Sequence, residues 1–203
     1  MTQFKLGQYF NINGIILNLK YSFRLHKIKP NILVNSILDL DLKKLKSENK
    51  VKYIIFDKDN TLTLPYKIEI ERKFEKKIEE FKNVFGKENI AILSNSAGSK
   101  DDKYYIEASK IENASGIKVV RHEYKKPKVY KDILSTFNLN SKNANFDNKE
   151  ICVIGDRLLV DILMGQEYGF YTVLVKPLTI ERDNFIVKIL RKFENFLSSK
   201  NKQ

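Results

Sequence analysis

The chain has 203 residues, 42% of them hydrophobic, and a formal net charge of +12, which fits one domain with enough apolar side chains for its own core. Eight glycines and four prolines exclude a collagen-like or proline-rich disordered chain. The single cysteine, Cys152, excludes a disulfide framework and a zinc site built from several cysteines. No apolar run approaches the roughly 18 residues of a membrane-spanning helix, so we expect a soluble protein without a secretory signal.

The positive charge is concentrated at the two ends of the chain. Residues 1–50 carry nine basic and three acidic side chains and residues 176–203 carry seven and three, whereas the stretch between them is almost balanced. Basic ends around a nearly neutral body indicate an anionic neighbour, either lipid headgroups or nucleic acid. Solvated charge that keeps the protein in solution is the alternative.

Residues 1–50 are interpreted as an N-terminal arm. Aliphatic and aromatic residues are interleaved with basic ones here, and no acidic residue precedes Asp39. We predict a basic, amphipathic arm that contacts a membrane, where each cation contributes about 1 kcal/mol near an anionic surface. An acid-poor start is also typical of a mitochondrial transit peptide, but Arg24 is the only arginine in this segment.

Strand-like and helix-like segments alternate in the middle of the chain. Short runs of β-branched and aromatic residues predict strands at residues 51–56, 90–93, 116–120, 151–154 and 171–175. Apolar residues at helical spacing predict helices over residues 69–85 and 128–137 and a basic helix within 176–203. This alternation predicts an α/β fold, a Rossmann-like parallel sheet with helices on both faces. Ligands of such sheets bind beyond the carboxyl ends of the strands.

Two aspartates directly follow the first of these strands. Asp57 and Asp59 lie two residues apart and could share one Mg²⁺, an ion that prefers oxygen ligands. A calcium loop is excluded because its pattern needs Gly and Glu where this chain has Leu62 and Ile68. An acidic turn after a strand is the remaining alternative.

Polar side chains also follow the other predicted strands. Ser94 and Asn95 open towards a helix and suit a phosphate group, although an ordinary helix cap has the same composition. Lys126 precedes a proline and could neutralise a phosphoryl group, unless it belongs to a solvated basic turn. Asp156 and Asp161 place two more carboxylates after a strand. Each motif is weak alone, but their order is informative.

An acid pair, a serine, a lysine and a second acid pair, each beyond a strand, resemble the four-part signature of the haloacid dehalogenase-like superfamily over residues 51–175. Four segments further resemble the phosphatidylglycerophosphate phosphatase family, known from mitochondria and with shorter bacterial relatives: FDKDNTLTLP, ILSNSAGS, RHEYKKP and VIGDRLLVDILMG. The flanks resemble that family as well. The resemblance implies a phosphatase domain over residues 51–203 that follows the arm.

The spacing of the motifs predicts a capless form of the haloacid dehalogenase-like fold. Only 36 positions separate Asp57 from Leu93 and 32 separate Ser94 from Lys126, which leaves no room for an inserted cap domain. An uncapped site is open, and an open site suits a phosphate on a large or surface-bound molecule. A phospholipid headgroup at a bilayer meets that requirement.

The resemblance implies a Mg²⁺-dependent enzyme that removes the terminal phosphomonoester of phosphatidylglycerophosphate and leaves phosphatidylglycerol, a precursor of cardiolipin. Asp57 is expected as the nucleophile that forms an aspartyl-phosphate, and Asp59 as the general acid and base. Mg²⁺ is expected on Asp57, on the main-chain carbonyl of Asp59 and on Asp156. Ser94 and Asn95 are expected to bind the phosphoryl oxygens.

Several further residues receive roles from the same resemblance. Lys126 is expected to stabilise charge on the phosphate and on the nucleophile, with Lys125 as the alternative. Asp161 is expected to support the metal or to position that lysine. Arg157 could reach the headgroup or form a surface salt bridge, and His122 could contact substrate or have a structural role.

The resemblance also implies a location and a partner. We expect peripheral association with an anionic membrane, at the matrix side of the mitochondrial inner membrane or the cytoplasmic face of a bacterial one, and no nucleic acid. A capless phosphatase of nucleic-acid ends or phosphoproteins is the main alternative, and basic ends would then track phosphates. A non-catalytic, membrane-binding scaffold would require the loss of a chemical residue, and all of them are present.

Overall fold

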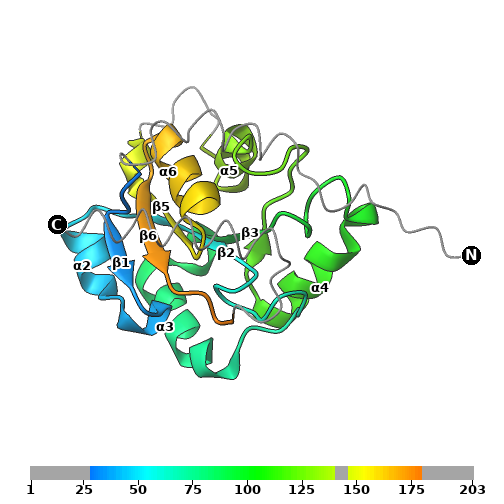
Figure 1. The fold of residues 1–203 in the computed structure, drawn as a ribbon, viewed down its shortest axis with the longest axis horizontal. Helices are drawn as coiled ribbons and strands as arrows, with labels where there is room; N and C mark the ends of the chain where they lie inside the picture. Colours follow the sequence, from blue (N-terminus) through cyan, green and yellow to red (C-terminus); the bar gives the residue numbers. More distant parts are fainter. Residues whose placement is uncertain (1–27, 140–145, 180–203) are drawn as a thin grey trace, which may run out of the picture.

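One parallel sheet organises the computed structural model, which describes residues 28–139 and 146–179 (Figure 1). The strands lie in the order β1 (Ile32–Val34), β6 (Tyr171–Val175), β5 (Ile151–Gly155), β2 (Tyr53–Asp57), β3 (Ile90–Leu93) and β4 (Lys118–Val119). Every neighbouring pair is parallel. The predicted α/β, Rossmann-like architecture is therefore confirmed.

Helices cover both faces of this sheet. The longer ones are α2 (Leu42–Ser47), α3 (Glu75–Phe85), α4 (Ile106–Ser115), α5 (Tyr130–Thr136) and α6 (Leu163–Tyr168). Short 3-10 turns lie at Ile37–Asp39, Arg72–Phe74, Lys87–Asn89, Lys103–Tyr105 and Asn148–Glu150, and a π-helical turn spans Leu158–Ile162. The connections after β2 and β3 contain one α-helix each and no inserted domain, which agrees with the predicted capless fold.

Alternate residues of the central strands enter opposite cores, because successive side chains of a strand point to opposite faces. On one face, Ile54 and Phe56 pack with side chains of α2, α3 and α4. On the other face, Ile55 packs with side chains of α5 and α6. The strands β2, β3, β5 and β6 are buried on both sides, which explains why they appear in the sequence as continuous apolar runs.

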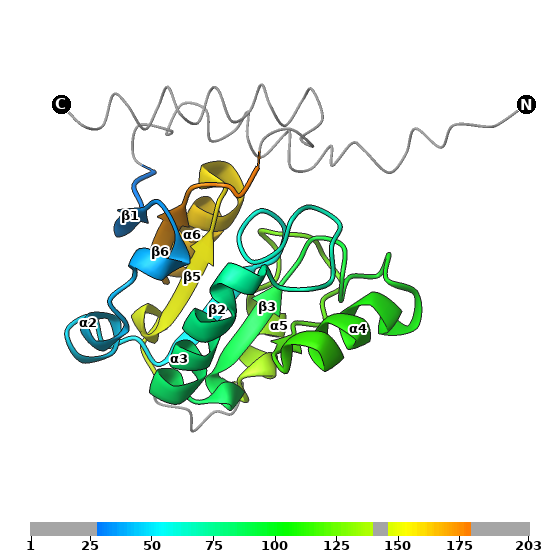
Figure 2. The ribbon, with the colours of Figure 1, turned by 90° about the horizontal axis from the view of Figure 1, so that it is seen from below.

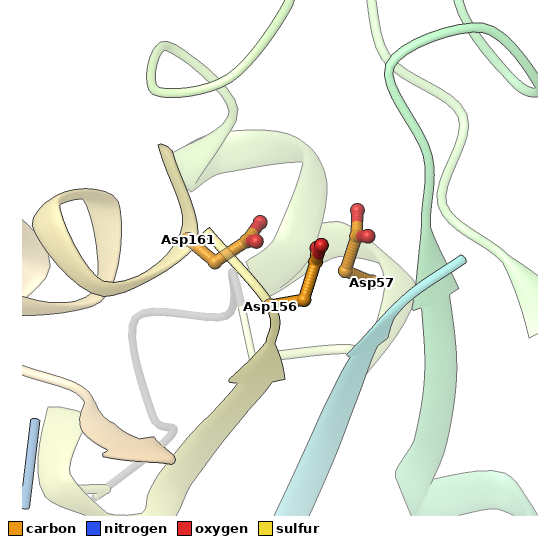
Figure 3. Close-up of side chains that lie close together, drawn as sticks. All are labelled: Asp57, Asp156 and Asp161. Carbon is orange, nitrogen blue, oxygen red and sulfur yellow. The ribbon is translucent and has the colours of Figure 1, made fainter. Parts of the chain in front are cut away.

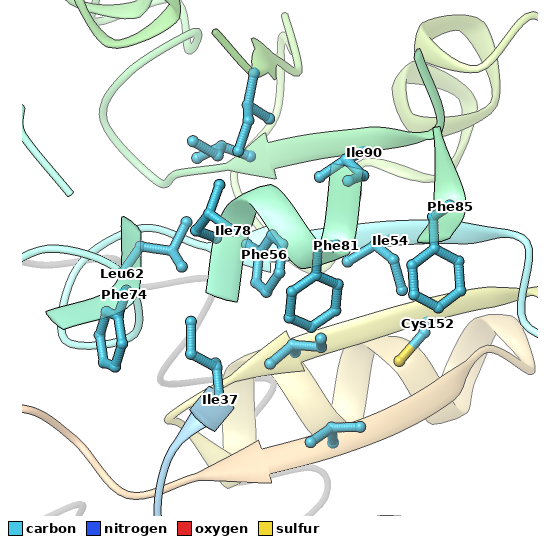
Figure 4. Close-up of a cluster of buried hydrophobic side chains, with 14 of the residues drawn as sticks. Ile37, Ile54, Phe56, Leu62, Phe74, Ile78, Phe81, Phe85, Ile90 and Cys152 are labelled. Atoms are coloured by element: carbon cyan, nitrogen blue, oxygen red, sulfur yellow. The ribbon is translucent and has the colours of Figure 1, made fainter. Parts of the chain in front are cut away.

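The first of these cores is built around aromatic rings (Figure 4). The rings of Phe56 and Phe81 meet edge to face with centroids 4.9 Å apart, and Phe85 stacks on Phe81 at 5.9 Å. Cys152 belongs to the same cluster and is fully buried. Burial raises the pKa of its thiol well above the ordinary value, so this cysteine is an apolar core residue.

The described part of the predicted arm, residues 28–50, contributes to the folded body. β1 pairs with β6, and Asn31 accepts a hydrogen bond from the Thr172 N–H at 2.9 Å. Four apolar side chains that the sequence pattern groups with the arm belong to the core: Ile37, Leu40, Leu42 and Leu45. The rest of the predicted arm, residues 1–27, and the predicted C-terminal helix within 180–203 lie outside the described residues.

The connection after β2 is longer than the sequence pattern predicts. The helix expected from residue 69 begins at Glu75, after a 3-10 turn. The loop before it is closed by main-chain hydrogen bonds, from Asn60 N–H to the Thr63 carbonyl at 2.8 Å and from Glu71 N–H to the Leu62 carbonyl at 3.0 Å.

Within the described residues, no helix combines the length and apolar character needed to cross a bilayer.

Candidate active site

Three carboxylates meet at the carboxyl edge of the sheet (Figure 3). Asp57 is the last residue of β2, Asp156 follows the neighbouring strand β5, and Asp161 lies in the π-helical turn after it. One oxygen from each of the three lies within 4.8 Å of the others. The sheet order thus brings together the residues that the sequence predicts beyond two different strands.

A buried lysine joins two of these carboxylates. Lys126, in the loop after β4, donates a hydrogen bond from Nζ to Oδ1 of Asp57 and another to Oδ1 of Asp161 at 2.8 Å. The alternative lysine, Lys125, is exposed and pairs with Asp101 at 2.7 Å. The structure therefore places Lys126 at the cluster and Lys125 outside it.

The cluster carries more negative than positive charge. Burial raises the pKa of Asp57 to about 8, the ammonium of Lys126 opposes this rise, and the carboxylates of Asp161 and Asp156 add to it. Burial lowers the pKa of Lys126, but Asp161 and Asp57 more than offset that effect and leave its pKa above the ordinary value. Three carboxylates around one ammonium form a site that a divalent cation would neutralise.

The second aspartate of the first motif lies apart from this cluster. Oδ1 of Asp59 accepts hydrogen bonds from Nζ of Lys58 at 2.7 Å and from the N–H of Tyr66 at 2.9 Å. Lys58 is buried and also donates to the Lys67 carbonyl at 2.9 Å. Lys58 is not among the residues predicted for the site, although a lysine between two aspartates is a visible signal in the sequence.

The loop after β3 is organised by Ser94. Its buried hydroxyl accepts hydrogen bonds from the N–H groups of Ser96 at 3.2 Å and Ala97 at 3.3 Å. The next helical turn begins only at Lys103, so Ser94 organises a loop and does not cap a helix. Oδ1 of Asn95 accepts from the N–H of Lys126 at 3.4 Å. This contact links the predicted phosphate-binding loop directly to the lysine of the cluster.

His122 lies beneath both loops rather than at the surface. Its Nε2 is 2.8 Å from the carbonyl oxygen of Ser94, and its Nδ1 is 2.6 Å from that of Tyr124. Carbonyl oxygens only accept, so both contacts are hydrogen bonds when both ring nitrogens carry a proton. The structure favours the structural alternative for this histidine, because it holds together the loops that carry Ser94 and Lys126.

The turn after β5 fixes the last predicted residues. Oδ2 of Asp161 accepts from the main-chain N–H of Arg157 at 3.2 Å. A Cβ atom on Gly155 would lie 2.4 Å from Cγ of Asp161, so a side chain is not tolerated there without movement. Arg157 is half-buried, and its Nε has no hydrogen-bond partner among the described residues.

Known proteins resemble this chain over most of its length. The chloroplastic/mitochondrial phosphatidylglycerophosphate phosphatase 1 of Arabidopsis thaliana is 36% identical over 191 residues, which cover 93% of this chain and 53% of that protein. The mitochondrial phosphatidylglycerophosphatase of Saccharomyces cerevisiae is 33% identical, over 92% of this chain and 98% of that protein. The probable phosphatase YqeG of Bacillus subtilis is 30% identical, over 84% and 89%.

This chain therefore spans about half the length of the Arabidopsis protein and nearly all of the yeast protein. The resemblance predicted from the motifs is confirmed, including the existence of a bacterial relative. The model of the mitochondrial PGP phosphatase family matches residues 12–179, and the chain belongs to this family of phosphatases.

Proposed function

We propose that this protein is a Mg²⁺-dependent phosphatidylglycerophosphatase, which removes the terminal phosphate and leaves phosphatidylglycerol. The observation that carries the proposal is the buried Lys126 between Asp57 and Asp161, beside Asp156. The names of the plant and yeast relatives support the lipid substrate. The capless fold supports a substrate too large for a closed pocket.

The donor set fits Mg²⁺. Asp57 and Asp156 offer carboxylate oxygens, which are hard ligands, and the excess negative charge of the cluster calls for a divalent ion. In our proposal these two residues and the main-chain carbonyl of Asp59 hold the ion, with Asp161 in support. A bound Mg²⁺ would supply charge neutralisation for a phosphomonoester dianion.

Asp57 is the nucleophile in this proposal. One of its carboxylate oxygens attacks phosphorus, the bond from phosphorus to the glycerol oxygen breaks, and an aspartyl-phosphate forms. Asp59 gives a proton to the departing oxygen. It then takes a proton from the water that attacks phosphorus, which releases inorganic phosphate and restores Asp57.

The surrounding residues hold the phosphoryl group and its charge. Lys126 lies against the nucleophile and balances the charge that the transferred phosphate brings. Ser94 and Asn95 bind phosphoryl oxygens from the loop after β3, and the Asn95 contact to the Lys126 main chain keeps the two groups in register. Arg157, the residue after Asp156, reaches in this proposal towards the remainder of the lipid headgroup.

The location follows from the relatives and the charge. Three of the plant and fungal relatives carry mitochondrial names, and the chain has a net charge of +12. We place the protein peripherally on an anionic membrane, at the matrix side of the mitochondrial inner membrane, or at the cytoplasmic face in a bacterium. The basic residues before residue 28 would provide the membrane-contacting arm.

The test is release of inorganic phosphate from phosphatidylglycerophosphate in mixed micelles, with and without Mg²⁺, for the wild type and for Asp57→Asn. We expect Mg²⁺-dependent release that disappears in the variant. Turnover of an aryl phosphate that needs Asp57, without release from the lipid, would refute the lipid substrate and favour a phosphatase of nucleic-acid ends or phosphoproteins. Inactivity on both would favour the scaffold.

A further inference from the structure

Exposed aromatic side chains occur on the connections that follow β2, β3 and β4. Seven large apolar or aromatic residues are exposed in the described part of the chain, and five of them form a group that we name the tyrosine rim: Tyr66, Tyr104, Tyr105, Ile106 and Tyr124. Tyr66 and Tyr104 are 80% and 82% exposed, and Tyr124 is 57% exposed. Five of the seven therefore lie on the loops after β2 and β4 and at the start of α4.

The tyrosine rim is built on the loops that carry the site. Tyr66 belongs to the loop after β2 and donates its N–H to Asp59, and Tyr124 lies two residues before Lys126 in the loop after β4. The loops after β3 and β4 are joined by a hydrogen bond from His122 N–H to the Gly98 carbonyl at 2.8 Å and by the Lys125–Asp101 ion pair. Figure 2 shows these loops at the same edge of the sheet.

Folding in water does not explain the rim. Tyr66, Tyr104 and Tyr105 all adopt positive φ, at 65°, 55° and 55°. Bulky residues rarely adopt this conformation because the side chain then crowds its own main chain. An aromatic side chain that is strained and also exposed contributes little to the core, so its place at the surface suits a contact outside the chain.

Basic side chains are interleaved with the aromatic ones. Lys103 lies over the ring of Tyr104 at 5.4 Å, Arg121 over that of Tyr105 at 5.3 Å, and Lys100 over that of Tyr124 at 5.9 Å. Apart from Lys126, residues 98–106 and 121–128 contain five basic and three acidic side chains. Three of these cations also form ion pairs, Lys100 with Glu123, Arg121 with Glu112 and Lys125 with Asp101, so the excess positive charge is two. Tyrosines beside an excess of cations match the headgroup level of an anionic bilayer, where the ring is half-immersed and the positive charge faces lipid phosphates.

We propose that the tyrosine rim docks on the surface of an anionic bilayer and holds the open site against the headgroups. This inference rests on the proposed lipid substrate and adds the surface that presents it. The rim lies on the loops of the catalytic cluster, so a docked molecule receives its phosphate from the membrane plane. The lipid then keeps its acyl chains in the bilayer during the reaction.

The test uses Tyr104→Asn together with Tyr105→Asn in the full chain. Asparagine tolerates positive φ better than tyrosine, so this double variant removes two rings and also relieves strain, and it is expected to fold at least as well. Neither residue belongs to the catalytic cluster, so turnover of a soluble aryl phosphate should not change. Turnover of phosphatidylglycerophosphate in vesicles of phosphatidylcholine and phosphatidylglycerol should fall by about tenfold.

Leu38→Asn is the matched control, because Leu38 is exposed like the rim residues but follows β1, the edge strand farthest from β4 in the sheet order. Its turnover on vesicles should equal that of the wild type. An equal loss of turnover on vesicles in the control would refute docking through the tyrosine rim. An unchanged turnover in the double variant would refute it as well. The same holds if the double variant binds vesicles normally and loses affinity for a single-stranded oligonucleotide.

Failure of the proposed function gives a different result. Sedimentation with vesicles that contain no phosphatidylglycerophosphate measures docking without catalysis. Wild-type sedimentation that the double variant loses, together with no phosphate release from the lipid, would reject the substrate and keep the docking surface. The opposite result is phosphate release from the lipid in micelles, with the wild type and the double variant sedimenting equally with vesicles. That result would support the substrate and reject docking through the tyrosine rim.

Discussion

Asp57 lies where the charges of four side chains meet. Its carboxylate and that of Asp161 accept hydrogen bonds from the ammonium group of Lys126, and a carboxylate oxygen of Asp156 lies within 4.8 Å of theirs. Burial is the main reason that the pKa of Asp57 rises to about 8, and the neighbouring carboxylates contribute further. In the absence of a divalent cation, a proton therefore competes for the oxygen that our mechanism uses as the nucleophile.

This competition predicts how stability depends on pH. The folded pKa of Asp57, about 8, lies above the ordinary 3.8, so the folded state binds the extra proton between these values. The corresponding stability is fully present below pH 3.8 and is lost as the pH rises through about 8. In EDTA, the free energy of unfolding measured in urea should fall as the pH rises through about 8. Asp57→Asn should not show this fall, and Mg²⁺ should reverse it in the wild type. Parallel curves for both proteins would contradict the raised pKa.

The adjacent lysines provide a second prediction at the same scale. Lys126→Met removes the buried ammonium at the nucleophile and should lower kcat by about 100- to 1,000-fold, the range found for single charge-stabilising groups. Lys125→Met removes an exposed pair with Asp101 and should change kcat by less than about twofold. Steady-state kinetics on an aryl phosphate compares them. A larger effect at Lys125 would reverse the assignment.

At the scale of elements, the end of β5 is where the main chain sets a side-chain position. Gly155 allows Asp161 to fold back over the strand end, where a Cβ atom would come within 2.4 Å of its carboxylate. Asp161 in turn holds Lys126 at 2.8 Å. The π-helical turn over Leu158–Ile162 provides this return path.

Two glycines distinguish positioning from packing. Gly155→Ala should displace the buried Asp161, cost about 1–3 kcal/mol of stability and lower kcat per folded molecule by about 100-fold, since small misplacements of a reacting group are costly. Gly165→Ala, in α6, would place Cβ 2.4 Å from Cγ2 of Thr172 and should cost about 1–3 kcal/mol of stability. Its kcat per folded molecule should stay unchanged. Similar kcat values for both variants would show that Asp161 does not position Lys126.

The elements also show what the sequence could predict. Five strands were predictable because parallel strands buried on both faces are continuous apolar runs. β1 was not, because its three residues lie in a basic segment and are strand only through their pairing with β6. A helix was expected after Ser94 and Asn95, but the bounds of α4 were not predictable, because it buries only Ala108 and Ile111 and follows two residues at positive φ.

At the scale of the whole molecule, the order of motifs predicted which strand ends carry chemistry, and the sheet order brings Asp57 and Asp156 together. The contacts of Lys58 and His122 were not predictable, because they depend on the paths of loops that the sequence pattern does not specify. Likewise, the distribution of charge predicted membrane contact at the ends of the chain. The tyrosine rim was not predictable from the sequence, because the sequence does not show which loops lie at the same edge of the sheet.

The pairing of β1 with β6 has a consequence for folding during synthesis on the ribosome. Asn31 and Thr172, which bond across this pair, are 141 positions apart. At roughly 5–20 residues per second, a ribosome needs about 7 to 28 s to make the partner of a strand that it finished long before. Through that interval β1 has no neighbour among the described strands. The sheet is therefore complete only after β6 has been synthesised. A nascent chain that stops before Tyr171 lacks β6 and leaves β1 unpaired.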